Sequence, residues 1–270
     1  MRLNISHKTT YHYADPPVFS AQVIRLTPRN NASQHVIRWR IEPSDGLSSW
    51  TDAFGNVCHT LVVDEPRERI EILASGEVDT VDLGGVLPRE VGELPLEVFL
   101  RQTDQTKPGA ALRDFARGFS DSLNKDRVSG LHELMNAVRD HVEYETGTTD
   151  ALATAAEAFD GKSGVCQDHA HIFIGFARSL GIPARYVSGY LYDGEHPDAF
   201  VAGHAWAAAW VDDLGWVSFD TSNRKSATDN HVSIAVGLDY ETASPICGVR
   251  SGGDGGERMD VAVTVSAAQQ

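Results

Sequence analysis

The sequence predicts an α+β protein with an N-terminal antiparallel β domain followed by a domain of helices and strands. Residues 1–100 contain short segments in which apolar and polar residues alternate, as they do in half-buried strands. From residue 101 onward, apolar residues recur at three- and four-residue steps, which indicates helices packed on a core. Strand-like apolar runs follow these helices, an order typical of α+β domains. We therefore expect two domains, residues 1–100 and 101–270.

The N-terminal strands are bounded by turn residues. In residues 35–43 (HVIRWRIEP), Ile37, Trp39 and Ile41 alternate with arginines, so this segment is predicted to be a strand with one buried face. The other predicted strands include residues 56–63 and 69–78. Residues 81–109 combine Gly, Pro and charges without any period, so we expect a connecting segment that wraps over the surface.

Two helices are predicted in the second domain. The first covers residues 130–145, and its apolar stripe is formed by Leu131, Leu134, Met135, Val138 and Val142. The second begins at the sequence Gly-Val-Cys and ends at Gly181 and Pro183, because Gly just beyond a helix with Pro soon after is a stop signal. The strands expected after it are residues 184–191, two strands within 201–223, and 257–267. The last of these is expected to return to the N-terminal domain.

Composition excludes several kinds of partner. The net charge of −15 disfavours binding to nucleic acid or to an anionic membrane surface. The first residues lack the apolar core of a signal peptide, and no run approaches the roughly 20 apolar residues of a membrane span, so we expect a cytoplasmic protein. Three widely spaced cysteines and no CxxC pair indicate a reducing compartment, and we expect neither a metal nor a cofactor.

Cys166 occupies a position that suits a nucleophile. It lies at the predicted start of a helix, where unpaired N–H groups and the helix dipole favour an anion such as a thiolate. Its backbone N–H is available to an oxyanion, and Gly164 allows a close approach of substrate to the backbone. A lone cysteine is more often a buried core residue, and we keep that interpretation for Cys58 and Cys247.

A catalytic thiol also needs a base and a residue that orients the base. His169 and His171 are two residues apart on one helix and so point about 200° apart, which prevents both from flanking Cys166. His204 opens an apolar strand, and Asp220 closes the next strand. If residues 212–214 form a three-residue loop, position 206 faces position 220 and His204 lies diagonally beside Asp220. An even-length loop would place the two side chains on opposite faces of the hairpin.

The chain resembles bacterial members of the transglutaminase-like superfamily that are often described as cysteine proteases. The resemblance is carried by residues 164–191, 203–223 and 231–249. It implies a papain-like fold in which a helix carrying the Cys packs on an antiparallel sheet carrying His and Asp. By this resemblance Cys166 is the nucleophile, His204 the general base and Asp220 the residue that orients His204.

The resemblance also implies a reaction, in which Cys166 attacks an amide carbonyl and a thioester forms. If water accepts the acyl group from this thioester, the enzyme is a peptidase or amidase, which is the activity we favour. If a primary amine accepts it, the enzyme is a transglutaminase. Arylamine acetyltransferases and peptide N-glycanases share the triad, but the chain has neither an evident acyl-CoA site nor a CxxC zinc module. A non-catalytic peptide-binding module is the remaining alternative. The expected partner is a peptide or protein substrate, and the oligomeric state is left open.

Other residues are given supporting roles. Asp168 and Arg185 match the family pattern, and we expect them to support the site or bind substrate rather than to react. Trp206 is a further candidate for the substrate cleft, although aromatic residues of a hairpin more often belong to the core. His231 also fits the resemblance, with a structural role as the alternative. No second oxyanion donor is assigned.

Overall fold

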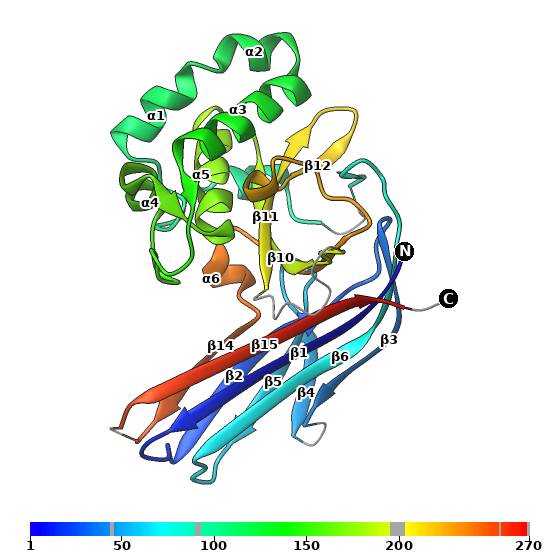
Figure 1. Ribbon diagram of the computed structural model, residues 1–270, viewed down its shortest axis with the longest axis vertical. Coiled ribbons are helices and arrows are strands. Elements are labelled where there is room, and N and C mark those ends of the chain that lie inside the picture. Colours follow the sequence, from blue (N-terminus) through cyan, green and yellow to red (C-terminus); the bar gives the residue numbers. More distant parts are fainter. Residues whose placement is uncertain (44–45, 90–92, 195–202, 254, 269–270) are drawn as a thin grey trace.

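Two four-stranded antiparallel sheets form the lower lobe of the molecule, and most of the helices lie on one side of a third sheet in the upper lobe (Figure 1). The computed structural model describes residues 1–43, 46–89, 93–194, 203–253 and 255–268. The first sheet consists, in spatial order, of β15 (Glu257–Ala267), β1 (Arg2–Tyr13), β6 (Arg69–Thr80) and β3 (Gln34–Glu42). The second consists of β14 (Ile246–Ser251), β2 (Phe19–Thr27), β5 (Val57–Val63) and β4 (Leu47–Thr51). We call these two sheets the sandwich.

The alternation predicted for the N-terminal strands is seen in their burial. Leu3 and Ile5 of β1 are buried, and the residue between them is only half-buried. In β3 the predicted strand is present, but Ile37 is 42% exposed rather than buried. The pairing of β3 with β6 shifts its register between Val36 and Arg38, so Ile37 lies in a bulge and leaves the ladder.

The C-terminal strands complete the sandwich. β15 pairs with β1 along its length, from Tyr13 opposite Glu257 to Leu3 opposite Ala267. The predicted return of residues 257–267 to the N-terminal domain is thereby confirmed. β14 likewise pairs with β2 of the other sheet. Both C-terminal strands lie on the side of the sandwich that faces the upper lobe (Figure 1).

The third sheet carries the upper lobe. Its strands are, in order, β13 (His231–Gly237), β10 (Ala184–Leu191), β11 (His204–Val211), β12 (Gly215–Phe219) and β7 (Val86–Leu87). The segment of residues 81–109 is more than a surface connection, because β7 pairs with Trp216 and Val217. Phe99 of the same segment is buried against the Trp216 ring. The description of this segment as a surface connection is therefore corrected, since its apolar residues extend the sheet and its core.

Helix α5 (Cys166–Ser179) packs against β11. Ala205, Ala207 and Ala209 turn toward it, and their small side chains allow the helix to lie close to the sheet. The predicted end of this helix is confirmed by Gly181, whose φ of +75° is the left-handed conformation that glycine adopts readily. No helix among the residues described in the structure is long and apolar enough to span a membrane.

The remaining elements surround α5. They are η1 (Leu96–Leu100), α1 (Ala110–Arg117), α2 (Ser120–Lys125), α3 (Arg127–His141), β8 (Glu143–Tyr144), α4 (Ala155–Gly161), β9 (Ser163–Gly164), η2 (Thr221–Asn223) and α6 (Tyr240–Ala243). The helix predicted over residues 130–145 ends earlier, at His141. Tyr144 belongs to β8 instead, which pairs in parallel with β9 immediately before Cys166. This pairing brings Tyr144 beside the start of α5.

Candidate active site

Cys166 is the first residue of α5 and is half-buried. Val165 before it is extended, so the backbone turns from strand into helix at the cysteine. The first N–H groups of a helix have no partner within the helix, which leaves the Cys166 N–H available to an oxygen atom in front of it. The predicted placement of Cys166 at a helix N-terminus is confirmed.

Asp168 holds this turn in place. Its Oδ2 accepts hydrogen bonds from the Val165 N–H at 2.8 Å and from the Thr149 hydroxyl at 2.6 Å. Burial raises the pKa of Asp168, and these hydrogen bonds oppose that shift. Glycine at position 164 leaves room for this carboxylate, because a Cβ there would lie 2.8 Å from Asp168 Oδ2. The close approach of substrate to Gly164 stays a prediction. Asp168 therefore positions the start of α5.

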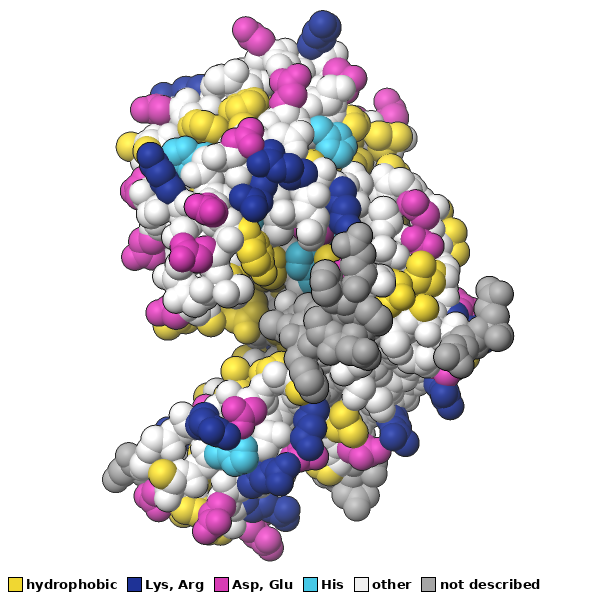
Figure 2. Space-filling view, viewed as in Figure 1, with side chains coloured by type: hydrophobic (Ala, Val, Ile, Leu, Met, Phe, Trp, Pro, Cys, Tyr) yellow, Lys and Arg dark blue, Asp and Glu magenta, His cyan; other side chains and the backbone are white. Residues whose placement is uncertain are grey.

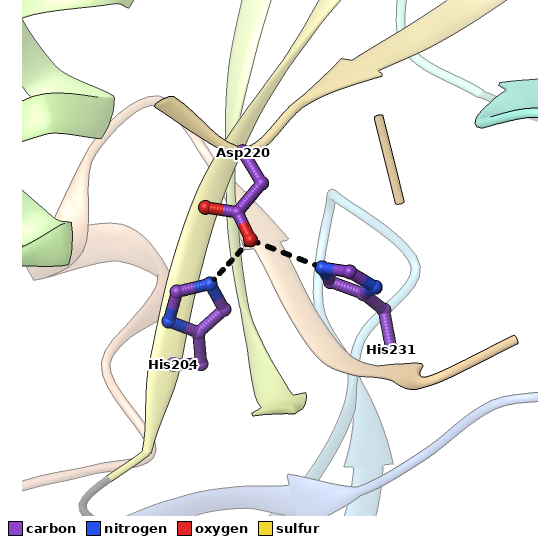
Figure 3. Close-up of side chains that lie close together, drawn as sticks. All are labelled: His204, Asp220 and His231. Atoms are coloured by element: carbon purple, nitrogen blue, oxygen red, sulfur yellow. Dashed lines mark hydrogen bonds and ion pairs between the residues drawn. The ribbon is translucent and has the colours of Figure 1, made fainter. Parts of the chain in front are cut away.

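The β11–β12 hairpin brings His204 and Asp220 together. Val211 pairs with Gly215 and Ala207 with Phe219, so residues 212–214 form the three-residue loop on which the sequence argument depended. His204 Nε2 lies 2.8 Å from Asp220 Oδ2, and both side chains are almost completely enclosed (Figure 3). The predicted register is confirmed.

His204 also interacts with Cys166. Its Nε2 is engaged by Asp220, so Nδ1 is the nitrogen left to face the Cys166 side chain, which contributes to the pKa shift of His204. Burial lowers the pKa of His204, but the hydrogen bonds and negative charges of Asp220 and Cys166 outweigh burial and raise this pKa from 6.5 to about 10. A protonated imidazole held by a carboxylate beside a cysteine is the arrangement that activates a cysteine nucleophile.

Asp220 is fixed by more than His204. His231, at the start of β13, places its Nε2 3.1 Å from the same Oδ2 (Figure 3). The His231 Nδ1 accepts the Thr228 N–H, so the ring proton is on Nε2, which donates it to Asp220. Asn223 Nδ2 donates to Oδ2 as well, at 2.8 Å.

These contacts explain the charge states around Asp220. Burial by itself raises the pKa of Asp220, yet the hydrogen bonds from His204 and His231 hold it well below its usual range. Burial lowers the pKa of His231 despite its bond to Asp220, which agrees with a neutral ring. A charged carboxylate with one charged and one neutral imidazole is the state that the geometry favours.

His204, Asp220 and His231 could be mistaken for a metal site, since one ligand atom of each lies within 4.8 Å of the others. The hydrogen bonds of these three residues do not fit a metal site. The His231 Nε2 carries a proton and has no lone pair to offer a cation, and Oδ2 already accepts three N–H groups. The arrangement therefore orients a base.

Two further predicted residues lie on the face of the sheet away from α5. Trp206 is buried and packs edge-on against His231, with their ring centroids 5.2 Å apart. It therefore shields the His–Asp–His group, which consists of His204, Asp220 and His231. Arg185 is separate from the Cys166 cavity: its Nη1 lies 3.1 Å from Glu93 Oε1, and its guanidinium covers the Trp216 ring at 4.3 Å. The structure therefore does not bring Arg185 to the nucleophile.

A cavity of about 350 Å³ opens beside Cys166 and His204, between the two lobes. The hollow is visible between the upper and lower lobes in Figure 2. His7, Thr9 and Tyr11 of β1 contribute to its wall, so the N-terminal strands form part of the cavity. Tyr144, Met259 and Val261 also line it and were not predicted from the sequence. Tyr144 was assigned to the helix expected over residues 130–145, and Met259 and Val261 had no local signal beyond an apolar side chain in a strand.

The model of the transglutaminase-like superfamily matches residues 113–221, which include Cys166, His204 and Asp220. The model of the bacterial transglutaminase-like N-terminal region matches residues 3–79. The chain is 32% identical to the uncharacterised protein ML0607 of Mycobacterium leprae over 98% of both chains.

The chain belongs to the transglutaminase-like superfamily.

Two other proteins are similar to this chain in sequence or in fold. The uncharacterised protein Rv2569c of Mycobacterium tuberculosis is 26% identical over 98% of this chain and 92% of its own. The fold matches the crystal structure of a "putative cysteine protease" from Cytophaga hutchinsonii with a TM-score of 0.76, at 21% identity, over 100% of this chain and 91% of that one. The predicted fold class is confirmed: a transglutaminase-like α+β core preceded by a β-sheet region.

Proposed function

We propose that the chain is a cysteine-dependent amide hydrolase that cleaves a peptide or isopeptide bond through a thioester on Cys166. The observation that carries the proposal is the position of His204, which hydrogen-bonds Asp220 through Nε2 and interacts with the Cys166 side chain. Nucleophile, base and orienting carboxylate are the three groups that acyl transfer requires. Membership of the transglutaminase-like superfamily supports an enzyme of this chemistry.

In the first half of the reaction the Cys166 thiolate attacks the amide carbonyl carbon and the carbonyl π electrons move to oxygen. The backbone N–H of Cys166 donates to that oxyanion at the start of α5. When the C–N bond breaks, the protonated Nδ1 of His204 gives its proton to the leaving amine. A thioester on Cys166 and a neutral His204 remain.

In the second half a water molecule attacks the thioester and His204 takes its proton. The C–S bond breaks, the carboxylic acid leaves, and the thiolate and imidazolium are restored. Asp220 keeps its charge throughout, since His231 and Asn223 remain hydrogen-bonded to it. Its contribution is to hold His204 with Nδ1 toward the sulfur and to stabilise the positive ring.

Intact-protein mass spectrometry after mixing with a panel of denatured proteins and activated esters tests the proposal. The expected result is an acyl adduct on wild-type protein that maps to Cys166, decays in water, and is absent from Cys166→Ala. Adding a primary amine distinguishes the two acceptors: an unchanged acid product means hydrolysis, whereas quantitative amide product makes the chain a transglutaminase. Absence of any adduct, with Cys166 as slow toward electrophiles as a free cysteine, would favour the peptide-binding module.

A further inference from the structure

Apart from Cys166 and His204, the residues described in the structure that line the cavity carry no charge near neutral pH. The described residues that line it are His7, Thr9, Tyr11, Tyr144, Thr146, Val165, Cys166, Gln167, Tyr186, Ser188, Gly189, Tyr190, Gly203, His204, Ala205, Ile234, Tyr240, Pro245, Ile246, Met259 and Val261. None of them is Asp, Glu, Lys or Arg, although such residues form 23% of the chain. Among the described residues, a charged group entering this space away from Cys166 and His204 would lose its hydration without gaining a partner of opposite charge.

The floor of the cavity is built by the first and last strands of the sandwich. In the register of β1 with β15, Tyr11 faces Met259 and Thr9 faces Val261, so all four side chains lie on one face. Met259 is 54% exposed and Val261 is 42% exposed. Farther along β15 on the same face, Val263 and Val265 are buried in the sandwich core. The apolar face of β15 therefore continues beyond the core into the cavity.

This floor is attached to the catalytic centre. His7 of β1 places Nδ1 2.9 Å from the Tyr190 hydroxyl of β10, and its Nε2 lies 3.1 Å from the Thr9 hydroxyl. Burial lowers the pKa of His7 to about 4, so its ring adds no charge near neutral pH. Next to Tyr190, Gly189 pairs directly with His204. Val261 is thus connected to His204 by strand pairing with Thr9, by the hydrogen bonds of His7 with Thr9 and Tyr190, and by the pairing of Gly189 with His204.

The cavity lining includes a third exposed apolar residue. Tyr144 of β8 is 41% exposed and is paired with Gly164, two residues before the nucleophile. Tyr144, Met259 and Val261 are therefore large apolar side chains that remain open to water while lining the same concave space as Cys166. Apolar surface exposed inside a pocket of this size is typical of a ligand site.

We infer that this cavity binds a bulky uncharged side chain of a polypeptide substrate, next to the amide bond that Cys166 attacks. The inference rests on the proposed function and assigns substrate selection to Met259 and Val261. An apolar side chain that fills the space removes its own surface and that of the cavity floor from water. Acidic and basic side chains are disfavoured, because apart from Cys166 and His204, which interact with each other and with Asp220, no lining residue described in the structure compensates their charge.

The test compares peptidyl chloromethyl ketones that carry Leu, Phe, Gly or Asp at the position next to the electrophile, with iodoacetamide as a small reference reagent. For wild-type protein we expect the Leu and Phe reagents to label Cys166 at least about thirtyfold faster than the Asp reagent. Met259→Ser combined with Val261→Thr should slow the Leu reagent about tenfold and leave the iodoacetamide rate within about twofold. Val249→Thr is the matched control, since Val249 is 68% exposed on β14 and lies outside the cavity lining.

The possible failures are distinguishable. Fast iodoacetamide labelling with equal rates for the four peptidyl reagents, or a preference that survives the double variant, overturns the inference and leaves the proposed function intact. A wild-type dimer that dissociates in the double variant overturns it as well, because a second copy of the chain is then the occupant. Iodoacetamide labelling as slow as that of a free cysteine removes the proposed function and, with it, this inference.

Discussion

Asp220→Asn should disable the nucleophile while leaving the fold in place. Asn has nearly the same shape as Asp, and Asp220 lies at the end of β12, where it accepts three N–H groups on Oδ2. Without the negative charge, the burial that lowers the pKa of His204 is opposed only by Cys166. We therefore expect the pKa of His204 in the variant to fall toward or below 6.5, which leaves the ring neutral near pH 7.

The expected decrease in the rate of Cys166 alkylation follows from the loss of the positive charge on His204. A thiol with the ordinary pKa of about 8.5 is only about 0.3% ionised at about pH 6, whereas a thiol paired with imidazolium is mostly ionised, a ratio of up to about 300. A thiolate stabilised in this way is intrinsically less nucleophilic, which reduces the expected difference to about tenfold. Turnover should fall further, by about 10²- to 10⁴-fold, because proton transfer by an oriented base is lost as well.

The assay is the rate of iodoacetamide alkylation of Cys166 at about pH 6, measured by peptide mass spectrometry. Asp212→Asn is the matched control, because Asp212 is in the loop of the same hairpin and its side chain is 75% exposed. We expect this control to behave as wild type, and thermal unfolding should show both variants folded. Alkylation of Asp220→Asn within about twofold of wild type would refute the role given to the carboxylate.

Three other predictions follow from the same contacts. His231→Ala removes the acceptor of the Thr228 N–H and one of the three donors to Asp220 Oδ2, so it should lower the free energy of unfolding by about 2–3 kcal/mol in urea titrations and slow Cys166 alkylation severalfold; wild-type values for both would contradict a role for His231 at the site. Asp168→Ala removes the acceptor of the Val165 N–H at the start of α5 and should cost about 1–2 kcal/mol by the same titration, whereas an unchanged midpoint would contradict this. Prolonged dialysis against EDTA should change neither alkylation nor the melting temperature, and a loss restored by zinc would show that the His–Asp–His group holds a metal.

The apolar–polar periodicity of the sequence predicted the parts of the site that are formed by elements adjacent in the chain. The loop of residues 212–214 and strict alternation along two strands were enough to bring His204 beside Asp220. The helix N-terminus at Cys166 followed from the Gly-Val-Cys sequence and the stop at Gly181. In both cases the relevant geometry is set within a few residues by backbone periodicity.

The rest depends on pairings between distant segments. His231 reaches Asp220 because β13 lies beside β10 in the sheet, and nothing near His231 in the chain specifies that neighbour. The cavity floor joins β1 to β15, which are separated by almost the whole sequence. Arg185 fits the family pattern, yet its partner Glu93 comes from the segment expected to be a surface connection. Periodicity identifies a strand but does not choose its partner.

The most direct test of the central claim is the titration of the His204 ring by ¹⁵N nuclear magnetic resonance, with the signal assigned from its absence in His204→Ala. The account predicts an imidazolium that persists through neutral pH and loses its proton near pH 10, because Asp220 and Cys166 stabilise the charged ring. Since this pKa lies above the ordinary 6.5, the ion pair contributes fully to folding stability below about pH 6.5 and that contribution is lost as the pH rises through about 10. In Cys166→Ala the titration should move to lower pH. A wild-type ring that titrates near 6.5, unaffected by Cys166→Ala, would contradict the account.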